Sequence, residues 1–275
     1  MKPEPAALGR ISARLLYSET PVQEEFMMHT HVRYEIYCFL EGDAYYTVEG
    51  TRYELEPGDL LLLCPGEVHR VVFRSPAPYR RIVVNFNDLA PLPEELADRL
   101  LRPFHDRAFG TFNRYAASAF PEWDFCAHLR AICEKRDPFT AYTLLLALLG
   151  VLGEAFQTLK TGVQVPAEQD SRLGARIIAY LTTHLTEPIS LDDLTAHFYL
   201  SKTHLNRVFR EATGATIWKY VMTKRLFLCR EMMQRGMRAS EAALRAGFKD
   251  YSTFYRAYKS RFGETPKTQR EKRKS

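Results

Sequence analysis

The sequence predicts an α+β protein of two domains: an N-terminal β-barrel with helices after it, and a C-terminal domain that is entirely helical. Three observations support this fold class: evenly spaced turn signals in the first third of the chain, helical spacing of apolar residues further on, and a change in the sign of the charge near residue 170. A chain of 275 residues is long enough for two domains that each bury a core.

The barrel is predicted over residues 27–86, where short runs rich in Tyr, Val, Ile, Phe and Leu alternate with turn signals. A glycine recurs every eight residues between these runs, at Gly42, Gly50, Gly58 and Gly66. Such regular spacing is typical of a small antiparallel barrel or sandwich. The period of two along a strand places Glu35, Tyr37 and Phe39 on one face. Residues 45–55 are predicted to form a hairpin that turns at Glu49–Gly50.

Three helices are predicted after the barrel, over residues 91–102, 120–134 and 138–159. The last has the clearest pattern, with apolar side chains at three- and four-residue steps: Tyr142, Leu145, Leu149, Leu152, Phe156 and Leu159. Two heptads are too few to establish a coiled coil. We expect a homodimer that uses this helix, with burial of the same residues against the protein's own barrel as the alternative.

The polar segment 162–170 is predicted to link a domain of residues 1–161 to one of residues 171–275. Residues 171–275 hold 21 Lys and Arg against 9 Asp and Glu, a net charge of +12, whereas residues 1–170 hold 17 against 24, a net charge of −7. A basic domain of this kind indicates a polyanionic partner, and a solvated charged surface is the alternative.

The cysteines and the N-terminus indicate an intracellular protein. Five cysteines occur without a C-x-x-C pair, and the first residues lack the apolar core of a signal peptide. The longest apolar run is interrupted by Gly150. We therefore expect reduced thiols, a cytoplasmic location and no membrane partner.

The basic domain contains a repeat. A shift of 49 residues overlays Ser201 on Asp250, Leu205 on Phe254, Arg207 on Arg256, Phe209 on Tyr258 and Gly214 on Gly263. Ser201 and Asp250 are good helix N-caps, and Gly214 and Gly263 suit the left-handed residue that ends a helix. A short helix is predicted before each, in SLDDLTAHF and SEAALRAG, and a longer one over residues 216–233 joins the two pairs. Helix, tight turn and polar-faced helix form an arrangement that reads the DNA major groove.

Two stretches, ISLDDLTAHFYLSKTHLNRVFREATG and GFKDYSTFYRAYKSRFGETP, resemble the DNA-binding domain of the AraC/XylS family over about residues 172–270. The resemblance implies a sequence-specific transcription regulator that binds double-stranded promoter DNA with both units and acts with RNA polymerase. Base contacts are expected from Thr203, Asn206, Arg207, Tyr251, Ser252, Tyr255 and Arg256, and phosphate contacts from Lys202, Arg210 and Lys259. Ala239 and Ala242 replace larger aliphatic residues that are usual in the family, which predicts a looser second unit.

The segment HTHVRYEIYCFLEG contains H-x-H-x3-E-x6-G, and PGEVH supplies P-G-x2-H. Together they resemble the two motifs of cupin barrels, which places His29, His31, Glu35 and His69 where such barrels hold a metal. Imidazole and carboxylate groups suit divalent iron, manganese, nickel or zinc. A divalent metal is therefore a candidate cofactor of a cupin-like barrel.

The same arrangement also resembles the sensor domains of AraC-type regulators, which bind a small molecule without catalysis. The resemblance and the residue types predict an effector site formed by His29, His31, Glu35, Tyr37, His69 and Arg81. Hydrogen-bonding groups beside aromatic rings suit a small, polar, hydroxylated molecule, and the resemblance implies a sugar or a related polar metabolite. The chain is thus predicted to be a regulator and not an enzyme. Two alternatives remain open: a metal-dependent cupin enzyme with a DNA-binding appendage, and a constitutive DNA-binding dimer.

Overall fold

The structure is a computed structural model that describes residues 11–26, 28–87, 89, 92–135, 137–161, 173–213, 215–234 and 236–266. The chain divides into two compact units, Met1–Asp170, which we call the barrel unit, and Ser171–Ser275, which we call the basic unit. The predicted linker, residues 162–170, lies outside the described residues.

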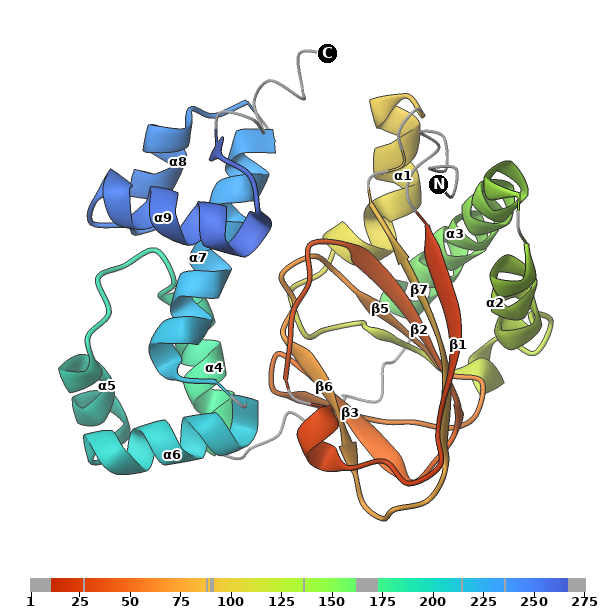
Figure 1. Cartoon of the computed structure of the whole chain (residues 1–275), viewed down its shortest axis with the longest axis horizontal. Helices are drawn as coiled ribbons and strands as arrows, with labels where there is room; N and C mark the ends of the chain where they lie inside the picture. The colour runs from red at the N-terminus through yellow and green to blue at the C-terminus, as the bar shows by residue number, and fades with distance from the viewer. Residues whose placement is uncertain are drawn as a thin grey trace, which may run out of the picture. The chain divides into compact units, whose positions relative to one another are not determined.

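The barrel unit is built from two antiparallel sheets (Figure 1). The larger has the order β1-β7-β2-β5-β8 and the smaller the order β4-β3-β6. The strands are β1 (Ser12–Ser18), β2 (Tyr34–Glu41), β3 (Ala44–Val48), β4 (Thr51–Glu54), β5 (Leu60–Leu63), β6 (His69–Phe73), β7 (Tyr79–Phe86) and β8 (Arg114–Tyr115). Strands that are neighbours in the sheet, such as β2 and β7, are therefore far apart in the chain, and their pairing brings residues that are distant in sequence next to each other.

Strand β2, in the middle of the larger sheet, is buried on both faces, whereas the edge strand β1 is partly exposed. Tyr37 and Phe39 point into a core shared with the smaller sheet, while Ile36 and Cys38 point into a second core beneath the helices. Because successive side chains point to opposite faces, the two cores receive alternate residues of the same strand. The predicted alternation along β2 is confirmed.

The four regularly spaced glycines lie in the turns between successive strands, from β2 to β6. In the β3–β4 hairpin, Glu49 has a φ of 50° and Gly50 a φ of 84°. Two central residues with positive φ match the turn type that suits the twist of a two-residue hairpin. The predicted hairpin and its turn are confirmed.

Three helices follow β7, with β8 between the first and the second: α1 (Glu94–His105), α2 (Phe125–Glu134) and α3 (Pro138–Thr161). Single-turn helices η1 (Gln23–Glu25) and η2 (Ala117–Ala119) lie in the connections. The predicted start of the second helix at residue 120 is wrong, because Asp124 caps α2 by accepting a hydrogen bond from the Ala127 N–H at 2.8 Å. The first helix begins at residue 94 instead of 91 and continues through Pro103 to His105.

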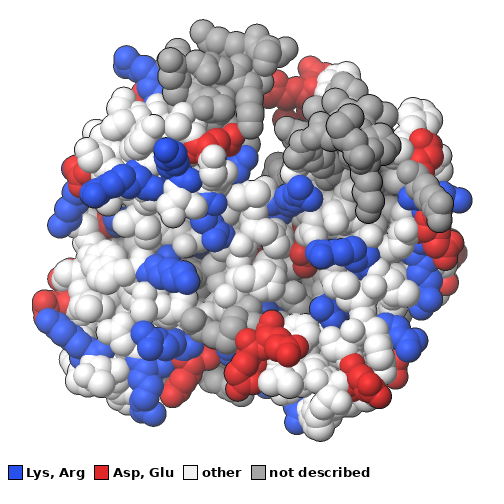
Figure 2. Space-filling model, viewed as in Figure 1, with Lys and Arg blue, Asp and Glu red and all other residues white. Residues whose placement is uncertain are grey.

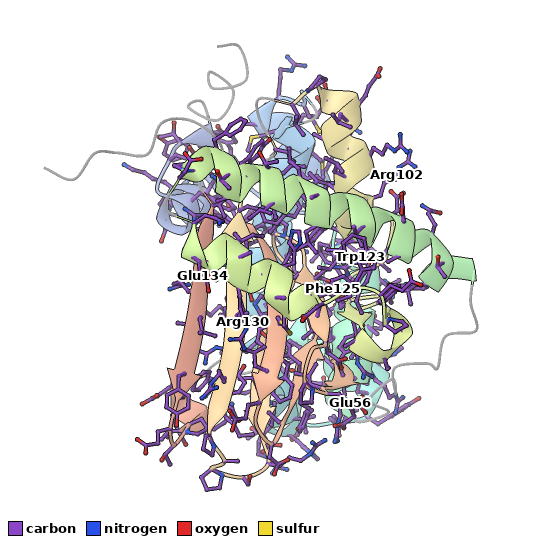
Figure 3. All side chains as sticks on the ribbon, turned by 90° about the vertical axis from the view of Figure 1, so that its right-hand side faces the viewer. Glu56, Arg102, Trp123, Phe125, Arg130 and Glu134 are labelled. Atoms are coloured by element: carbon purple, nitrogen blue, oxygen red, sulfur yellow. The ribbon has the colours of Figure 1, made fainter. Side chains whose placement is uncertain are left out.

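The apolar seam of α3 faces the protein's own sheet. Tyr142, Leu145 and Leu149 are buried in the core beneath the helices, as are Leu152 and Phe156. Figure 3 shows α2 and α3 lying across the outer face of the larger sheet. Among the described residues α3 is the one helix whose length and composition would suffice to cross a membrane, and the burial of its apolar side chains in this core, against α1 and α2, accounts for that composition. Of the two expectations for the seam, burial in the protein's own barrel is the one observed.

A buried ion pair fixes the connection after α1. The carboxylate of Glu67 lies 2.6 Å and 2.8 Å from the two terminal nitrogens of Arg107, and neither side chain is exposed. Glu67 also accepts hydrogen bonds from the backbone N–H groups of Cys64 and Gly110 and from the Asn113 amide. Burial by itself would raise the pKa of Glu67, but the Arg107 charge and these hydrogen bonds hold it below its ordinary value.

The basic unit is all helical: α4 (Leu173–Thr183), α5 (Leu191–Phe198), α6 (Lys202–Thr213), α7 (Ile217–Gln234), α8 (Ala239–Arg245) and α9 (Tyr251–Phe262). The pairs α5–α6 and α8–α9 lie at opposite ends of α7 (Figure 1). The predicted connecting helix and both helix pairs are thus present.

A second buried cation, Arg225, ties the two ends of the basic unit to α7. Its guanidinium donates hydrogen bonds to the backbone carbonyls of Leu185, Glu187 and Gly247 at 2.7–2.9 Å. The first two carbonyls precede α5, and the third precedes α9. A Cβ on Gly247 would lie 2.9 Å from the Arg225 Cζ and 2.8 Å from a backbone oxygen, so this turn has no room for a side chain. We call Arg225 and these three carbonyls the arginine clamp.

Candidate DNA-reading helices and effector site

The helix α6 is specified at its start and along its inner face. Ser201 accepts a hydrogen bond from the His204 N–H at 3.2 Å, as an N-cap residue does. Leu205 and Phe209 are fully buried, which anchors α6 in the unit. Ser190 and Asp193 form a reciprocal capping box at the start of the preceding α5. The predicted N-cap Ser201 is confirmed, and Gly214 lies outside the described residues.

The outer face of α6 carries the predicted DNA contacts in exposed positions, with Asn206 half-buried. Lys202 lies 2.7 Å from Asp192, and Arg207 lies 3.7 Å from Glu211. The Asn206 amide donates to the Lys202 carbonyl at 3.0 Å. Pairs between exposed charges are weak, so phosphate oxygens or base edges can replace these acidic partners at little cost. The remaining members of this set, Thr203 and Arg210, are also exposed.

The helix α9 presents a different chemistry. Asp250 accepts from the Thr253 N–H at 2.7 Å, and Gly263 ends the helix with a φ of 70°, so both predicted ends are confirmed. Phe254 and Tyr258 are fully buried. The outer face displays the five predicted contacts: Tyr251, Ser252, Tyr255, Arg256 and Lys259. Where α6 offers cations and amides, α9 offers two exposed phenol rings beside one Arg and one Lys. Figure 2 shows Lys and Arg spread over the visible face of the basic unit, at the left.

The barrel unit brings together three of the predicted metal and effector residues. His31 precedes β2, Glu35 lies near the start of β2 and His69 begins β6. Their ligand atoms all lie within 4.8 Å of one another, and His31 Nε2 is 2.9 Å from a Glu35 oxygen. We call these residues the His–Glu–His cluster. His29 lies outside it: its backbone pairs with that of His69, and the two ring centroids are 4.5 Å apart.

Backbone carbonyls orient both histidines of this cluster. His31 Nδ1 lies 2.7 Å from the Arg33 carbonyl, and His69 Nδ1 lies 2.8 Å from the Glu67 carbonyl. A carbonyl can only accept, so each Nδ1 carries the hydrogen and each Nε2 faces the interior of the cluster. Among the described residues, the buried Nε2 of His69 has no hydrogen-bond partner. Histidine ligands of metals are commonly held by this kind of Nδ1 hydrogen bond.

The charges within the cluster are compatible with a bound cation. Burial by itself would raise the pKa of Glu35, but the hydrogen bond from His31 and the charges of His69 and His31 lower it to about 2. Burial lowers the pKa of His69 to about 3, although the charge of Glu35 opposes this shift. A carboxylate beside two Nε2 atoms needs a proton or a metal ion between them. The donor set of two imidazoles and one carboxylate therefore fits a divalent transition metal.

Two further predicted residues, the buried Tyr37 and the half-buried Arg81, lie beside Tyr79 in the barrel unit. Tyr37 is 1% exposed, and its hydroxyl is 2.7 Å from the hydroxyl of Tyr79. The Arg81 guanidinium lies 4.6 Å from the centre of the Tyr79 ring. Its Nη1 is buried and has no hydrogen-bond partner in the described part of the chain. The interior thus holds a cationic donor that a ligand oxygen could accept from.

Sequence analysis missed three residues of this interior: Tyr46, Tyr79 and Asn85. The Asn85 amide donates to Glu35 at 2.7 Å, and the Tyr46 ring is stacked 6.0 Å from the His69 ring. Two of the three could have been found, because Tyr79 and Asn85 alternate with Arg81 along β7 and so share its face. Tyr46 required the pairing of β3 with β6.

Two family models match the chain. An AraC-like ligand binding domain matches residues 13–135, and a helix-turn-helix domain matches residues 194–272. The first range covers the two sheets of the barrel unit except for Ser12 at the start of β1, and the second contains the helices α6–α9 of the basic unit. The predicted family and the two-domain α+β class are confirmed.

Three curated relatives extend this result. The probable transcription factor PqrA of Proteus vulgaris is 34% identical over 98 residues, which are 34% of this chain and 80% of that protein. The uncharacterized HTH-type transcriptional regulator YbfI of Bacillus subtilis (strain 168) is 26% identical over 84% of this chain and 82% of its own. The HTH-type transcriptional activator RhaS of Klebsiella pneumoniae (strain 342) is 23% identical over 91% and 90%. The chain therefore belongs to the AraC family of DNA-binding transcription regulators and carries a ligand-binding domain ahead of its helix-turn-helix domain.

Proposed function

We propose that the protein is a transcription regulator that binds specific promoter DNA through α6 and α9 and responds to a small polar molecule held in the barrel unit. One observation carries the DNA-binding half of this proposal: two capped helices, each buried along one side and polar along the other, are joined by the single helix α7. Major grooves on one face of DNA are separated by roughly 34 Å, one helical turn. The proposed site therefore has two blocks of base contacts one turn apart.

The side chains of the two helices divide between bases and phosphates in this proposal. Arg207 and Arg256 pair with guanine, and Asn206 pairs with adenine, because these side chains match the donor and acceptor pattern of each base in the major groove. Lys202, Arg210 and Lys259 contact phosphates, as point charges do. Thr203, Tyr251, Ser252 and Tyr255 complete the base contacts.

Selection of duplexes from a random DNA pool by the full-length protein tests this half. We expect enriched sites with two conserved blocks one helical turn apart. Arg207→Ala should erase the base preference in one block and Arg256→Ala that in the other. Each substitution should weaken the free energy of binding to the selected site by about 1–3 kcal/mol. Arg102→Ala, on the exposed surface of α1, is the matched control and should leave the sites unchanged. A single block that survives both substitutions would contradict the assignment of the helices.

The effector half rests on unsatisfied polar atoms inside the barrel. His69 Nε2 and Arg81 Nη1 are both buried without hydrogen-bond partners in the described residues, beside the Tyr37–Tyr79 hydroxyl pair. Such atoms are costly unless a ligand satisfies them. We propose a hydroxylated or anionic metabolite, with a sugar as the first choice. His29 at the rim would complete the site.

Titration of the full-length protein with a panel of sugars and sugar acids tests the effector. A binding compound should raise the midpoint of thermal unfolding and change the affinity for the selected DNA. Arg81→Lys keeps the charge but loses the guanidinium geometry, and it should weaken binding of that compound tenfold or more. DNA affinity that no compound changes would favour a constitutive DNA-binding dimer.

The His–Glu–His cluster favours a divalent metal as a second ligand of the barrel. His31, Glu35 and His69 would hold it, and the ion would supply a positive charge that neutralises Glu35 and attracts an effector oxygen. Equilibrium dialysis of the metal-stripped protein against Zn²⁺ should give one ion per chain, and Glu35→Gln should abolish it. We propose that such a metal serves sensing or stability and not turnover, and sustained conversion of a substrate would instead favour an enzyme.

We also propose a homodimer that works in the cytoplasm together with RNA polymerase. Because the inner seam of α3 is buried, the outer side is the available surface: Phe139 is 63% exposed, and Gly150 and Gly153 have no atom within 4 Å of an added Cβ. Close approach of a second helix suits such small residues. Sedimentation should show a dimer that Gly153→Gln dissociates, and a dimer unchanged by this substitution would place the interface elsewhere.

A further inference from the structure

Two cysteines of the barrel unit lie in direct contact although 88 residues separate them in sequence. Cys38 on β2 and Cys126 on α2 have their sulfur atoms 2.9 Å apart. Both are free thiols, and a disulfide bond has a length of about 2.05 Å. The helix α2 packs on β1, β2 and β7, so the contact joins the larger sheet to the helix that covers it. Formation of a bond between these sulfurs requires a movement of less than about 1 Å.

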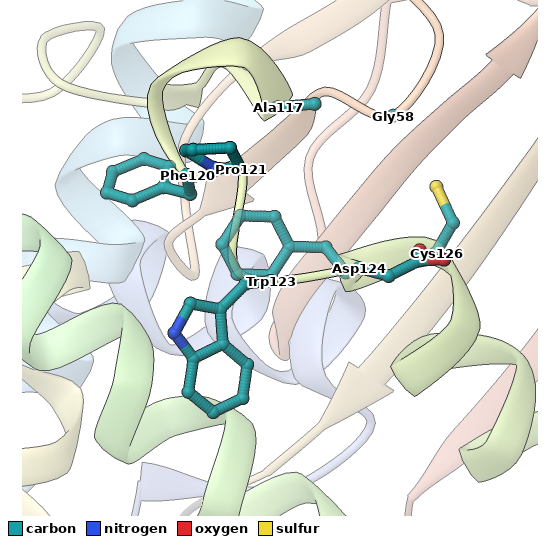
Figure 4. Close-up of a pocket in the computed structure, with 8 residues that line it drawn as sticks. Gly58, Ala117, Phe120, Pro121, Trp123, Asp124 and Cys126 are labelled. Carbon is teal, nitrogen blue, oxygen red and sulfur yellow. The ribbon is translucent and has the colours of Figure 1, made fainter.

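The two thiols differ in their access to solvent. Cys38 is fully buried in the core beneath the helices, whereas Cys126 is half-buried. Cys126 lines a cleft of about 240 Å³ together with Gly58, Ala117, Phe120, Pro121, Trp123, Asp124 and Phe125. Figure 4 shows the Cys126 sulfur at one side of this cleft, away from the Trp123 ring. A small molecule can therefore meet Cys126 first.

The neighbouring groups also give the Cys126 and Cys38 thiols different acidities. The hydrogen bond from Cys38 lowers the pKa of Cys126 and the Arg130 charge acts in the same direction, while burial and the charges of Asp124 and Asp59 oppose the shift. The contact with Cys126 and burial both raise the pKa of Cys38. Since the thiolate is the nucleophile in disulfide exchange, Cys126 is suited to attack and Cys38 to resolve.

We propose that Cys38 and Cys126 form a reversible disulfide by exchange with a small-molecule disulfide such as glutathione disulfide. The Cys126 thiolate attacks one sulfur of glutathione disulfide, and one glutathione leaves. Cys38 then attacks the Cys126 sulfur of the mixed disulfide, the Cys38–Cys126 bond forms and the second glutathione leaves. Two electrons pass from the protein to glutathione disulfide, and the two thiol protons end on the two released glutathione molecules.

The bond would form on the face of β2 opposite the proposed effector residue Tyr37, and in the barrel unit instead of the basic unit. It would join α2 covalently to β2 and close a loop of 88 residues. A cross-link across a long loop restricts the unfolded chain. Oxidation should therefore raise the unfolding midpoint of the barrel unit, by roughly 5–10 °C for a chain of this size.

The test uses the full-length protein equilibrated without oxygen in mixtures of reduced and oxidised glutathione. Free thiols are then blocked with N-ethylmaleimide in denaturant, and peptides are identified by mass spectrometry. We expect a cross-linked peptide pair containing Cys38 and Cys126 that grows as the mixture becomes oxidising and disappears with dithiothreitol. Cys133, also on α2 and half-buried, is the internal control. It should stay reduced and be recovered as its N-ethylmaleimide adduct.

Variants separate the pair from general oxidation. Cys133→Ser should keep both the cross-link and the rise in the unfolding midpoint, and Cys126→Ser should lose both. Glutathione attached to Cys126 with Cys38 still a free thiol would overturn the proposal, because it would show modification of one cysteine alone. Two free thiols in mixtures that fully oxidise dithiothreitol would also overturn it.

Discussion

Replacing Arg107 with Met should destabilise the barrel unit by about 3 kcal/mol, because it leaves the carboxylate of Glu67 buried without its counter-charge. Removal of one partner of a buried ion pair typically costs about 3–5 kcal/mol. We take the lower end because two backbone N–H groups, of Cys64 and Gly110, still donate to Glu67 at 2.7 Å and 2.8 Å. The unfolding midpoint should fall by roughly 6–12 °C.

The cost should depend on pH in a defined direction. In the native protein the pKa of Glu67 is lowered, so its contribution is present above the unfolded value of 4.5 and is lost as pH falls through the folded pKa. Without Arg107, burial dominates and raises the pKa of Glu67, so a protonated carboxyl becomes the less costly form. The loss of stability caused by Arg107→Met should therefore be largest near pH 7 and shrink toward pH 4.5.

Urea unfolding measured by tryptophan fluorescence gives the assay. The chain has two tryptophans, Trp123 in the barrel unit and Trp218 in the basic unit, so a Trp218→Phe background reports the barrel unit alone. Arg102→Met, on the exposed surface of α1, is the matched control and should change stability by less than about 0.5 kcal/mol. A loss below 1 kcal/mol for Arg107→Met, or a loss that does not change between pH 7 and pH 4.5, would refute the reasoning.

Three further predictions concern the basic unit. Arg225→Met removes three hydrogen bonds to backbone carbonyls. In competition binding it should reduce the loss of DNA affinity caused by adding one or two base pairs between the two blocks of the site. An unchanged loss would exclude a role for the clamp in spacing. Arg207→Ala should cost more DNA affinity than Arg256→Ala in anisotropy titrations if the second unit is looser, and equal losses would count against that hypothesis. Lys202→Gln should lower the slope of log affinity against log salt concentration by about 1 for all sequences, and a loss confined to some sequences would instead indicate base contact.

The features predicted correctly from sequence depend on short-range patterns. The alternation along β2 and the turn at Glu49–Gly50 follow from neighbouring residues, and the helices α6 and α9 follow from caps and apolar spacing repeated at a fixed distance. The Glu67–Arg107 pair joins residues 40 apart in sequence, and the Cys38–Cys126 contact joins residues 88 apart. No local rule brings such residues together, because their meeting depends on strand order and on which helix covers which face.

The candidate effector site shows the same division. The resemblance to cupin motifs identified His31, Glu35 and His69 correctly as neighbours, although it also included His29, which lies outside the cluster. Asn85, on β7, could be assigned to the site only from the structure, which pairs it with Glu35 on β2. The start of α2 was predicted wrongly because the apolar residues before Asp124 extend the helical spacing, whereas the capping side chain decides where the backbone becomes helical.

The arginine clamp has a consequence for how target promoters can change over evolutionary time. Single base substitutions in a bound site each cost about 1–3 kcal/mol, roughly independently, so they can accumulate one at a time while binding persists. An inserted or deleted base pair between the blocks shifts one groove by about 3.4 Å along the axis and rotates it as well. A unit whose two ends are fastened to one helix through Arg225 does not follow such a shift. Target promoters should therefore vary in sequence but share one spacing, and a new spacing would require changes in α7 or at the clamp.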